Sequence, residues 1–183
     1  YAILWDPPNH LFESFPNLEL IQSLGAGIDH ILSKNYPKNC IITKLEDPDL
    51  TDQMTEYAIM STLMCYRRYF KYKNLKNKFI WSQLPSIKTK EFQITILGYG
   101  NIAKNIAKEL ARFGFKVNIW ASKKRTVKKY NYFFGSNQLF QSVKKSNCIL
   151  NLLPNTSKTL DLVNLSLFKK LAKEAYFINI GRG

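Results

Sequence analysis

Short apolar runs separated by turn residues characterise residues 1–50. The predicted strands are residues 2–5, 18–24 and 40–43. The turn signal DPPN at residues 6–9 follows the first strand, and the tripeptide GAG at residues 25–27 follows the second. Apolar side chains within residues 28–32 predict one or two helical turns before the third strand. The pattern therefore predicts a small α/β unit.

A long helical pattern separates this unit from the rest of the chain. The segment DPDL at residues 47–50 interrupts the sequence, and residues 51–79 then carry apolar side chains at helical spacing. Thr51 or Asp52 is the predicted N-cap. We interpret the helix as a connector between two domains, which comprise residues 1–50 and 51–183.

Beyond residue 91 the pattern changes to strands that alternate with helices. Strands are predicted at residues 93–97, 116–120, 132–134, 148–153 and 176–180, and helices at residues 101–113 and 165–171 and after the N-cap Ser136. The strands are apolar on both faces, which is typical of a parallel sheet covered by helices on both sides. The predicted fold class is α/β, with a Rossmann-type doubly wound parallel sheet.

The turn after the first of these strands reads GYGNIA at residues 98–103. This is the GxGxxA form of the dinucleotide fingerprint, and it lies between a strand and a helix as the motif requires. Gly98 permits the tight turn, Gly100 lets a pyrophosphate approach the backbone, and Ala103 allows close packing of helix on strand. Amide groups at the helix N-terminus favour an anion. The predicted cofactor contacts here are Gly98, Tyr99, Gly100, Asn101 and Ile102.

The end of the next strand decides between the two nicotinamide cofactors. Enzymes that use NAD place an acidic residue there to bind the ribose hydroxyls, but this chain reads WASKKR at residues 120–125. Ser122 can hydrogen-bond a 2′-phosphate, and Lys123 or Arg125 can neutralise it. We therefore predict a preference for NADP(H), with NAD(H) as the alternative cofactor. A solvated basic turn is the other interpretation of these residues.

The net charge of +14 raises the question of a nucleic-acid partner. The lysines are spread over most of the chain rather than gathered in a stripe, so we predict no nucleic-acid binding. No apolar run approaches the ~20 residues that cross a bilayer, and no membrane association is predicted. Cys40, Cys65 and Cys148 are scattered, which predicts neither a metal site nor a disulfide, and reduced thiols favour a cytoplasmic protein.

Both ends of the sequence interrupt elements of structure. The chain begins without Met on a strand-like segment and ends on FINIGRG, where an arginine stands between glycines at the end of a strand. We interpret the chain as part of a longer protein, and Arg182 as a residue at the mouth of a site.

Several segments together resemble the D-isomer-specific 2-hydroxyacid dehydrogenases, in particular their glyoxylate/hydroxypyruvate reductase branch. They are PNLELIQSLGAGIDHIL, DPDLTDQMTEYA, ILGYGNIA, LLPNTSKT and FINIGRG, in family order over nearly the whole chain. The resemblance implies a smaller, flavodoxin-like substrate domain, a Rossmann-type cofactor domain, and an active site in the cleft between them. It also implies reversible hydride transfer between NAD(P)H and a small 2-keto acid, and a homodimer joined through the cofactor domains.

The same resemblance assigns roles to individual residues. Arg182 matches the catalytic arginine, which holds the substrate carboxylate and polarises the keto oxygen, a task suited to a planar, permanently charged guanidinium. Backbone amides of Gly25, Ala26 and Gly27 are expected to bind the substrate carboxylate, with a simple tight turn as the alternative. Trp5 is expected either to line the pocket or to belong to the core. The remaining expected cofactor contacts are Leu153, Pro154, Thr156, Ile180 and Gly181, and Gly183 is expected to allow close approach.

The family's general acid, a histidine paired with a glutamate, lies after the arginine and beyond the last residue of this chain. The only histidines are His10 and His30, and neither is expected to be the acid. Two alternatives stay open: a dehydrogenase for a different keto acid, and an NAD(P)H-binding regulator built on the same fold.

Overall fold

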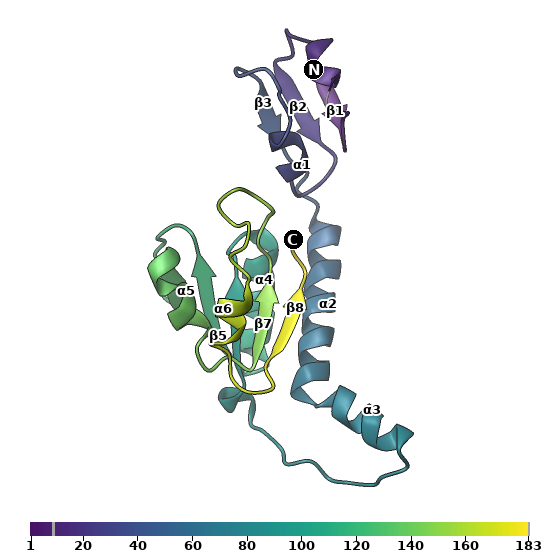
Figure 1. The fold of residues 1–183 in the computed structure, drawn as a ribbon, viewed down its shortest axis with the longest axis vertical. Coiled ribbons are helices and arrows are strands. Elements are labelled where there is room, and N and C mark those ends of the chain that lie inside the picture. Colours follow the sequence, from purple (N-terminus) through teal and green to yellow (C-terminus); the bar gives the residue numbers. More distant parts are fainter. Residues whose placement is uncertain (9, 183) are drawn as a thin grey trace.

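A computed structural model describes residues 1–8 and 10–182, so the predicted turn residue Asn9 and Gly183 lie outside the described residues. The first 43 residues form a three-stranded parallel sheet in the order β1-β2-β3 (Figure 1). Its elements are β1 (Ala2–Leu4), η1 (Leu11–Glu13), β2 (Leu20–Ser23), α1 (Asp29–Leu32) and β3 (Ile41–Thr43). A small core of its own holds it together, with Phe12, Ile21, Ile31 and Cys40 buried.

The predicted single helix over residues 51–79 is wrong in two respects. The structure has two helices, α2 (Pro48–Tyr66) and α3 (Tyr69–Asn77), because Arg68 adopts a left-handed conformation with φ of 56°. The N-cap is Asp47, whose side chain accepts a hydrogen bond from the Asp49 amide at 2.9 Å. Pro48 occupies the first helical position, where its missing N–H costs nothing, so DPDL begins the helix instead of preceding it.

The second sheet contains five parallel strands in the order β6-β5-β4-β7-β8. The strands are β4 (Gln93–Leu97), β5 (Lys116–Ala121), β6 (Asn131–Phe134), β7 (Cys148–Asn151) and β8 (Tyr176–Asn179). The accompanying helices are η2 (Thr89–Glu91), α4 (Asn101–Arg112), α5 (Ser136–Val143) and α6 (Leu165–Phe168). The strand order reverses between β4 and β7, which is where ligands bind in doubly wound sheets.

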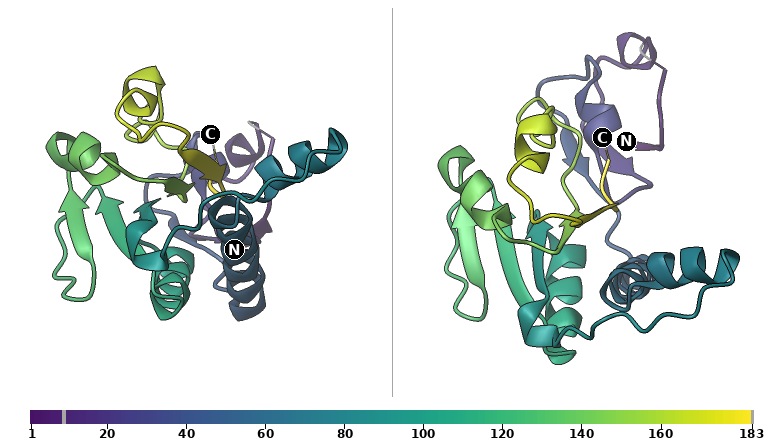
Figure 2. Two further views of the ribbon diagram at one scale, coloured as in Figure 1. Left: turned by 90° about the horizontal axis from the view of Figure 1, so that it is seen from below. Right: turned by 60° about the horizontal axis from the view of Figure 1, so that its bottom comes forward.

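Helices cover both faces of this sheet (Figure 2). Ile94 and Ile96 of β4 face α2 and α4, and Leu97 of the same strand packs with α5 and α6. The side chains of these three residues are fully buried, and each contributes about 1.5–3 kcal/mol by leaving water. The predicted α/β class with a Rossmann-type doubly wound sheet is confirmed.

Several predicted boundaries change. The strand predicted at residues 176–180 as fully buried is half-buried, because β8 is the edge of the sheet in the described residues and ends at Asn179. Ser136 is the first residue of α5 rather than its cap, which is Gly135 with φ of 70°. Among the described helices, none is long and apolar enough to cross a membrane. All three cysteines are free and buried.

Candidate functional site

A cavity of about 920 Å³ lies where the carboxyl ends of strands from both sheets meet. Its lining consists of Trp5, residues 24–27, Asp29, residues 44–48, residues 50–52, Met54, residues 100–105, residues 152–154 and residues 180–182. The segments that directly follow β1, β2, β3, β7 and β8 all contribute, together with the start of α4. Ligand sites of open α/β sheets lie at this end of the strands, so the cavity is the candidate site.

The glycine turn between β4 and α4 shows why each glycine is needed. Gly98 has φ of +102°, and a Cβ there would lie 3.0 Å from the carbonyl oxygen of Leu152. Gly100 differs, because a Cβ there would meet no atom within 4 Å. The space is therefore open, as a bound pyrophosphate requires. Among the described residues, no side chain caps the N-terminus of α4, and the amides of its first turn are available to an anion.

Two loops beyond β7 and β8 are joined by backbone hydrogen bonds. The amide of Gly181 donates to the Asn151 carbonyl at 2.7 Å, and the amide of Arg182 donates to the Leu153 carbonyl at 3.2 Å. A Cβ at Gly181 would lie 2.5 Å from that Leu153 oxygen, so only glycine fits there. These hydrogen bonds hold the backbone at Arg182, and so determine from where its side chain extends.

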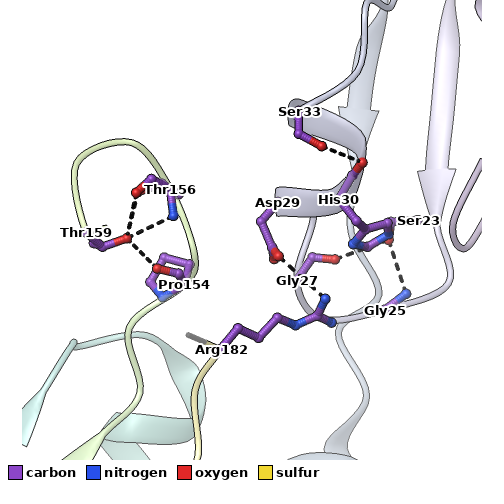
Figure 3. A network of polar contacts seen from close by, with 10 residues as sticks. All are labelled: Ser23, Gly25, Gly27, Asp29, His30, Ser33, Pro154, Thr156, Thr159 and Arg182. Carbon is purple, nitrogen blue, oxygen red and sulfur yellow. Dashed lines mark hydrogen bonds and ion pairs between the residues drawn. The ribbon is translucent and has the colours of Figure 1, made fainter. Parts of the chain in front are cut away.

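The side chain of Arg182 crosses the cavity to the loop that follows β2 (Figure 3). Its Nη1 lies 3.5 Å from Oδ2 of Asp29, and its guanidinium carbon lies 5.8 Å from the ring centre of Trp5. A Cβ at Gly27 would approach the guanidinium to 3.4 Å. The structure thus brings Arg182 against the GAG loop, although the two are 155 residues apart in sequence (182 − 27).

The amides of the GAG loop are not equivalent. The Gly25 amide donates to the Ser23 hydroxyl at 3.2 Å, whereas the amides of Ala26 and Gly27 have no partner among the described residues. A Cβ at Gly25 would collide with the Trp5 ring, so this glycine serves packing. The amides of Ala26 and Gly27 are therefore the ones in this loop that remain available to an anion.

Asp29 is a site residue that the sequence analysis missed. Its side chain is 12% exposed, and Oδ1 has no hydrogen-bond partner among the described residues. The only signal in the sequence is its place directly after the GAGI segment. The ring of His30, the next residue, contacts the Trp5 ring at a tilt of 42°, with ring centres 5.3 Å apart. Both ring nitrogens of His30 are buried without a partner in the described part of the chain. His30 does not line the cavity.

The residues predicted for the cofactor divide into three groups. Those lining the main cavity are Gly100, Asn101, Ile102, Leu153, Pro154, Ile180 and Gly181. Thr156 does not line it, because its amide and hydroxyl bond to Thr159 at 2.9 Å within their own loop (Figure 3). Gly98 lines neither cavity. Ser122 and Lys123 are exposed and line neither cavity, and Lys123 uses its carbonyl to accept from the Tyr132 hydroxyl at 2.7 Å.

Tyr99 and Arg125 line a second cavity of about 620 Å³ on the outer side of the turn. Nη1 of Arg125 donates to the Tyr99 carbonyl at 3.4 Å. The other lining residues are Lys104, Lys108, Thr126, Val127, Lys128, Lys129 and Tyr130. Burial raises the pKa of the Tyr130 phenol, which therefore stays neutral near pH 7. α4 contributes Lys104 and Lys108, which were not predicted from the sequence. Their place in this cavity depends on how the loop after β5 folds, which the spacing along the chain does not show.

A doubly wound sheet with a GxGxxA turn opening on a cavity defines a dinucleotide-binding α/β protein. The family model described as "D-isomer specific 2-hydroxyacid dehydrogenase, NAD binding domain" matches residues 59–183. The chain belongs to this family.

Named relatives agree with this membership. The chain is 35% identical over 189 aligned residues to a glyoxylate/hydroxypyruvate reductase A of Enterobacter sp. (strain 638), covering 100% of this chain and 60% of the relative. A probable 2-hydroxyacid dehydrogenase from Rhizobium etli in complex with NADP, HEPES and tartaric acid is 31% identical with a TM-score of 0.91. An NADPH-dependent glyoxylate/hydroxypyruvate reductase from Sinorhizobium meliloti is 30% identical with a TM-score of 0.89. Both structures match 100% of this chain and 59% of their own. The chain thus spans about three fifths of the length of these relatives.

Proposed function

We propose that this chain belongs to an NADPH-dependent reductase that converts small 2-keto acids, such as glyoxylate and hydroxypyruvate, into 2-hydroxy acids by hydride transfer. One observation carries the proposal: Arg182 lies against the GAG loop in a cavity whose lining also includes the open glycine turn. A cationic fork opposite backbone amides suits a carboxylate, and an uncapped helix start suits a pyrophosphate. The relatives named for this activity support it.

We also propose that residues 1–50 belong to a flavodoxin-like substrate domain and residues 51–183 to the cofactor domain. The two sheets have separate cores, which supports the division. The three strands of the first sheet follow one another in chain order, so the flavodoxin-like topology rests on the resemblance alone.

The residues of the main cavity fit a dinucleotide. Amides of Asn101 and Ile102 would bind the pyrophosphate beside Gly100, where a side chain would occupy the open space. The segments ending in Pro154 and Gly181 form the wall toward Arg182. The bound cofactor supplies the hydride. Of the predicted set Ser122, Lys123 and Arg125, only Arg125 lines a cavity, and its charge would favour the phosphorylated form of the cofactor.

Arg182 would bind the substrate carboxylate and polarise the keto oxygen as negative charge develops on it. The amides of Ala26 and Gly27, in the loop beside the guanidinium, would donate further hydrogen bonds to the carboxylate. We propose that the proton donor lies outside these 183 residues. His30 supports this view, because its ring is packed on Trp5 and does not line the cavity.

A homodimer is the assembly we propose, with a second copy of the chain covering α3 and the segment after it. Six large apolar side chains are exposed there: Tyr69, Phe70, Tyr72, Phe79, Ile80 and Trp81. This part extends away from the rest of the molecule (Figure 1). We propose a cytoplasmic location, supported by three buried thiols. We also propose that the protein has no nucleic-acid partner, since its lysines are spread over most of the chain.

The test is turnover by the full-length protein, followed as loss of NADPH absorbance. We expect reduction of glyoxylate and hydroxypyruvate, with weaker reduction of a bulky aromatic 2-keto acid as the comparison. Tight NADPH binding without turnover of any keto acid would contradict the enzyme and favour the regulator. Equal or faster turnover with NADH would contradict the proposed cofactor preference.

A further inference from the structure

Tyr99, the residue between the two glycines of the turn, is a meeting point for cations from two elements. Nζ of Lys104 on α4 lies 6.0 Å from the centre of the Tyr99 ring. Arg125, from the loop after β5, donates to the Tyr99 carbonyl at 3.4 Å. The Tyr99 ring itself is held edge-on against Tyr132, with ring centres 5.8 Å apart. The turn therefore carries a fixed aromatic residue with a cation at its ring and another at its carbonyl.

Lys104 lines both the main cavity and the second cavity. It begins the α4 hydrogen-bond ladder, because its amide donates to the Gly100 carbonyl at 3.0 Å. A side chain at this position lies beside the open space at Gly100, where the pyrophosphate is expected. A ligand that reached from one cavity into the other would pass Lys104.

The second cavity has an unbalanced charge. Its described lining contains five cations and no carboxylate; the cations are Lys104, Lys108, Arg125, Lys128 and Lys129. The neutral phenol of Tyr130 does not offset them. Like charges gathered on one concave surface repel one another, and a doubly charged phosphate would relieve that repulsion.

We infer that Lys104 binds the 2′-phosphate of NADPH together with Arg125, and that it is a main determinant of cofactor choice. The phosphate would lie in the second cavity, with Lys108 adding to the positive field. The inference rests on the proposed function, in which the main cavity holds the dinucleotide. It changes the assignment made from sequence, because Ser122 and Lys123 line neither cavity.

Lys104→Gln tests the inference in the full-length protein. Binding of NADPH and NADH is measured by fluorescence titration, and binding of adenosine 2′,5′-bisphosphate by competition. We expect about fivefold weaker binding of NADPH and of the bisphosphate, the upper range for an exposed ion pair, and a change of less than twofold for NADH. Lys104→Glu is expected to move the preference further toward NADH, because a carboxylate repels the phosphate.

Lys116→Gln is the matched control, since Lys116 is an exposed lysine at the amino end of β5, the end opposite the turn. The same loss of one charge there should leave the preference unchanged. Equal weakening of NADPH and NADH by Lys104→Gln would overturn the inference, as would equal effects of the two lysine variants. A thermal melt without ligand recognises a misfolded variant, so equal weakening counts against the inference only for a folded protein. If the wild-type protein binds neither cofactor, both the proposed function and this inference are overturned. If the wild type prefers NADPH and Lys104→Gln keeps that preference, only the inference is overturned.

Discussion

Arg182 is the residue whose geometry most directly implies chemistry. Lysine at this position keeps the charge but replaces a planar fork of donors by a point donor, so it cannot bind a carboxylate and polarise a keto oxygen together. We expect Arg182→Lys to lower kcat/KM for glyoxylate by about 10²–10³, the range for removing one donor to a developing oxyanion. Titration with NADPH should give an unchanged Kd, because the glycine turn is untouched. An active variant would remove Arg182 from the proposed mechanism.

Individual residues differ in how far sequence could identify them. Gly98 and Gly100 belong to a local motif, so their spacing alone predicted a dinucleotide turn, and Arg182 stood out because it lies between glycines after a strand. Asp29 and Lys104 act through contacts with distant segments, namely Arg182 and the loop after β5. Such contacts depend on how two elements pack, and no spacing along the chain encodes them.

At the scale of the element, the two glycines of the turn between β4 and α4 have different roles: Gly98 is needed for stability, and Gly100 for the proposed cofactor binding. Gly98→Ala forces a side chain into a backbone with φ of +102° and against the Leu152 carbonyl, so we expect a loss of about 1–3 kcal/mol in the free energy of unfolding. Gly100→Ala enters open space and should change stability by less than about 0.5 kcal/mol. It should nevertheless weaken NADPH binding by about tenfold, or 1.4 kcal/mol, because the new methyl group would occupy the space proposed for the pyrophosphate.

Thermal melts without ligand and titrations with NADPH distinguish the two variants. The opposite result, a stable Gly98→Ala and an unstable Gly100→Ala, would contradict the roles assigned to the two glycines. A Gly100→Ala protein that binds NADPH as the wild type does would place the pyrophosphate elsewhere.

Elements with a repeating pattern were predicted best. β4 was predicted without error, since four consecutive apolar or β-branched residues, at positions 94–97, precede a glycine turn. The prediction of one helix over residues 51–79 was wrong because the apolar spacing continues across Arg68. The left-handed conformation of Arg68 breaks the helix, and no glycine or proline in the sequence marks the break. Its start was misplaced for a different reason: Asp47 and Pro48 are strong signals for a helix start, and they were interpreted as an interruption.

The whole molecule combines a site formed by two sheets with an apolar extension that neither sheet covers. Phe79 and Trp81 are 98% and 90% exposed, in the extended segment that follows α3. Aromatic side chains of this size bury about 150–250 Å² each in an interface. In a symmetric dimer both copies would contribute these two rings to the interface. A dimer through this extension would leave the cavity open, because none of the described residues that line it belongs to α3 or the segment after it.

We therefore expect light scattering to give a dimer mass for the full-length wild type and a monomer mass for the double variant Phe79→Asp, Trp81→Asp. Leu160→Asp is the control, since Leu160 is 64% exposed in a different loop and its replacement should leave the dimer intact. Both rings lie outside every buried cluster, so the double variant should keep the NADPH affinity of the wild type. A double variant that stays dimeric would place the interface on another surface, and a monomeric wild type would contradict the proposed assembly.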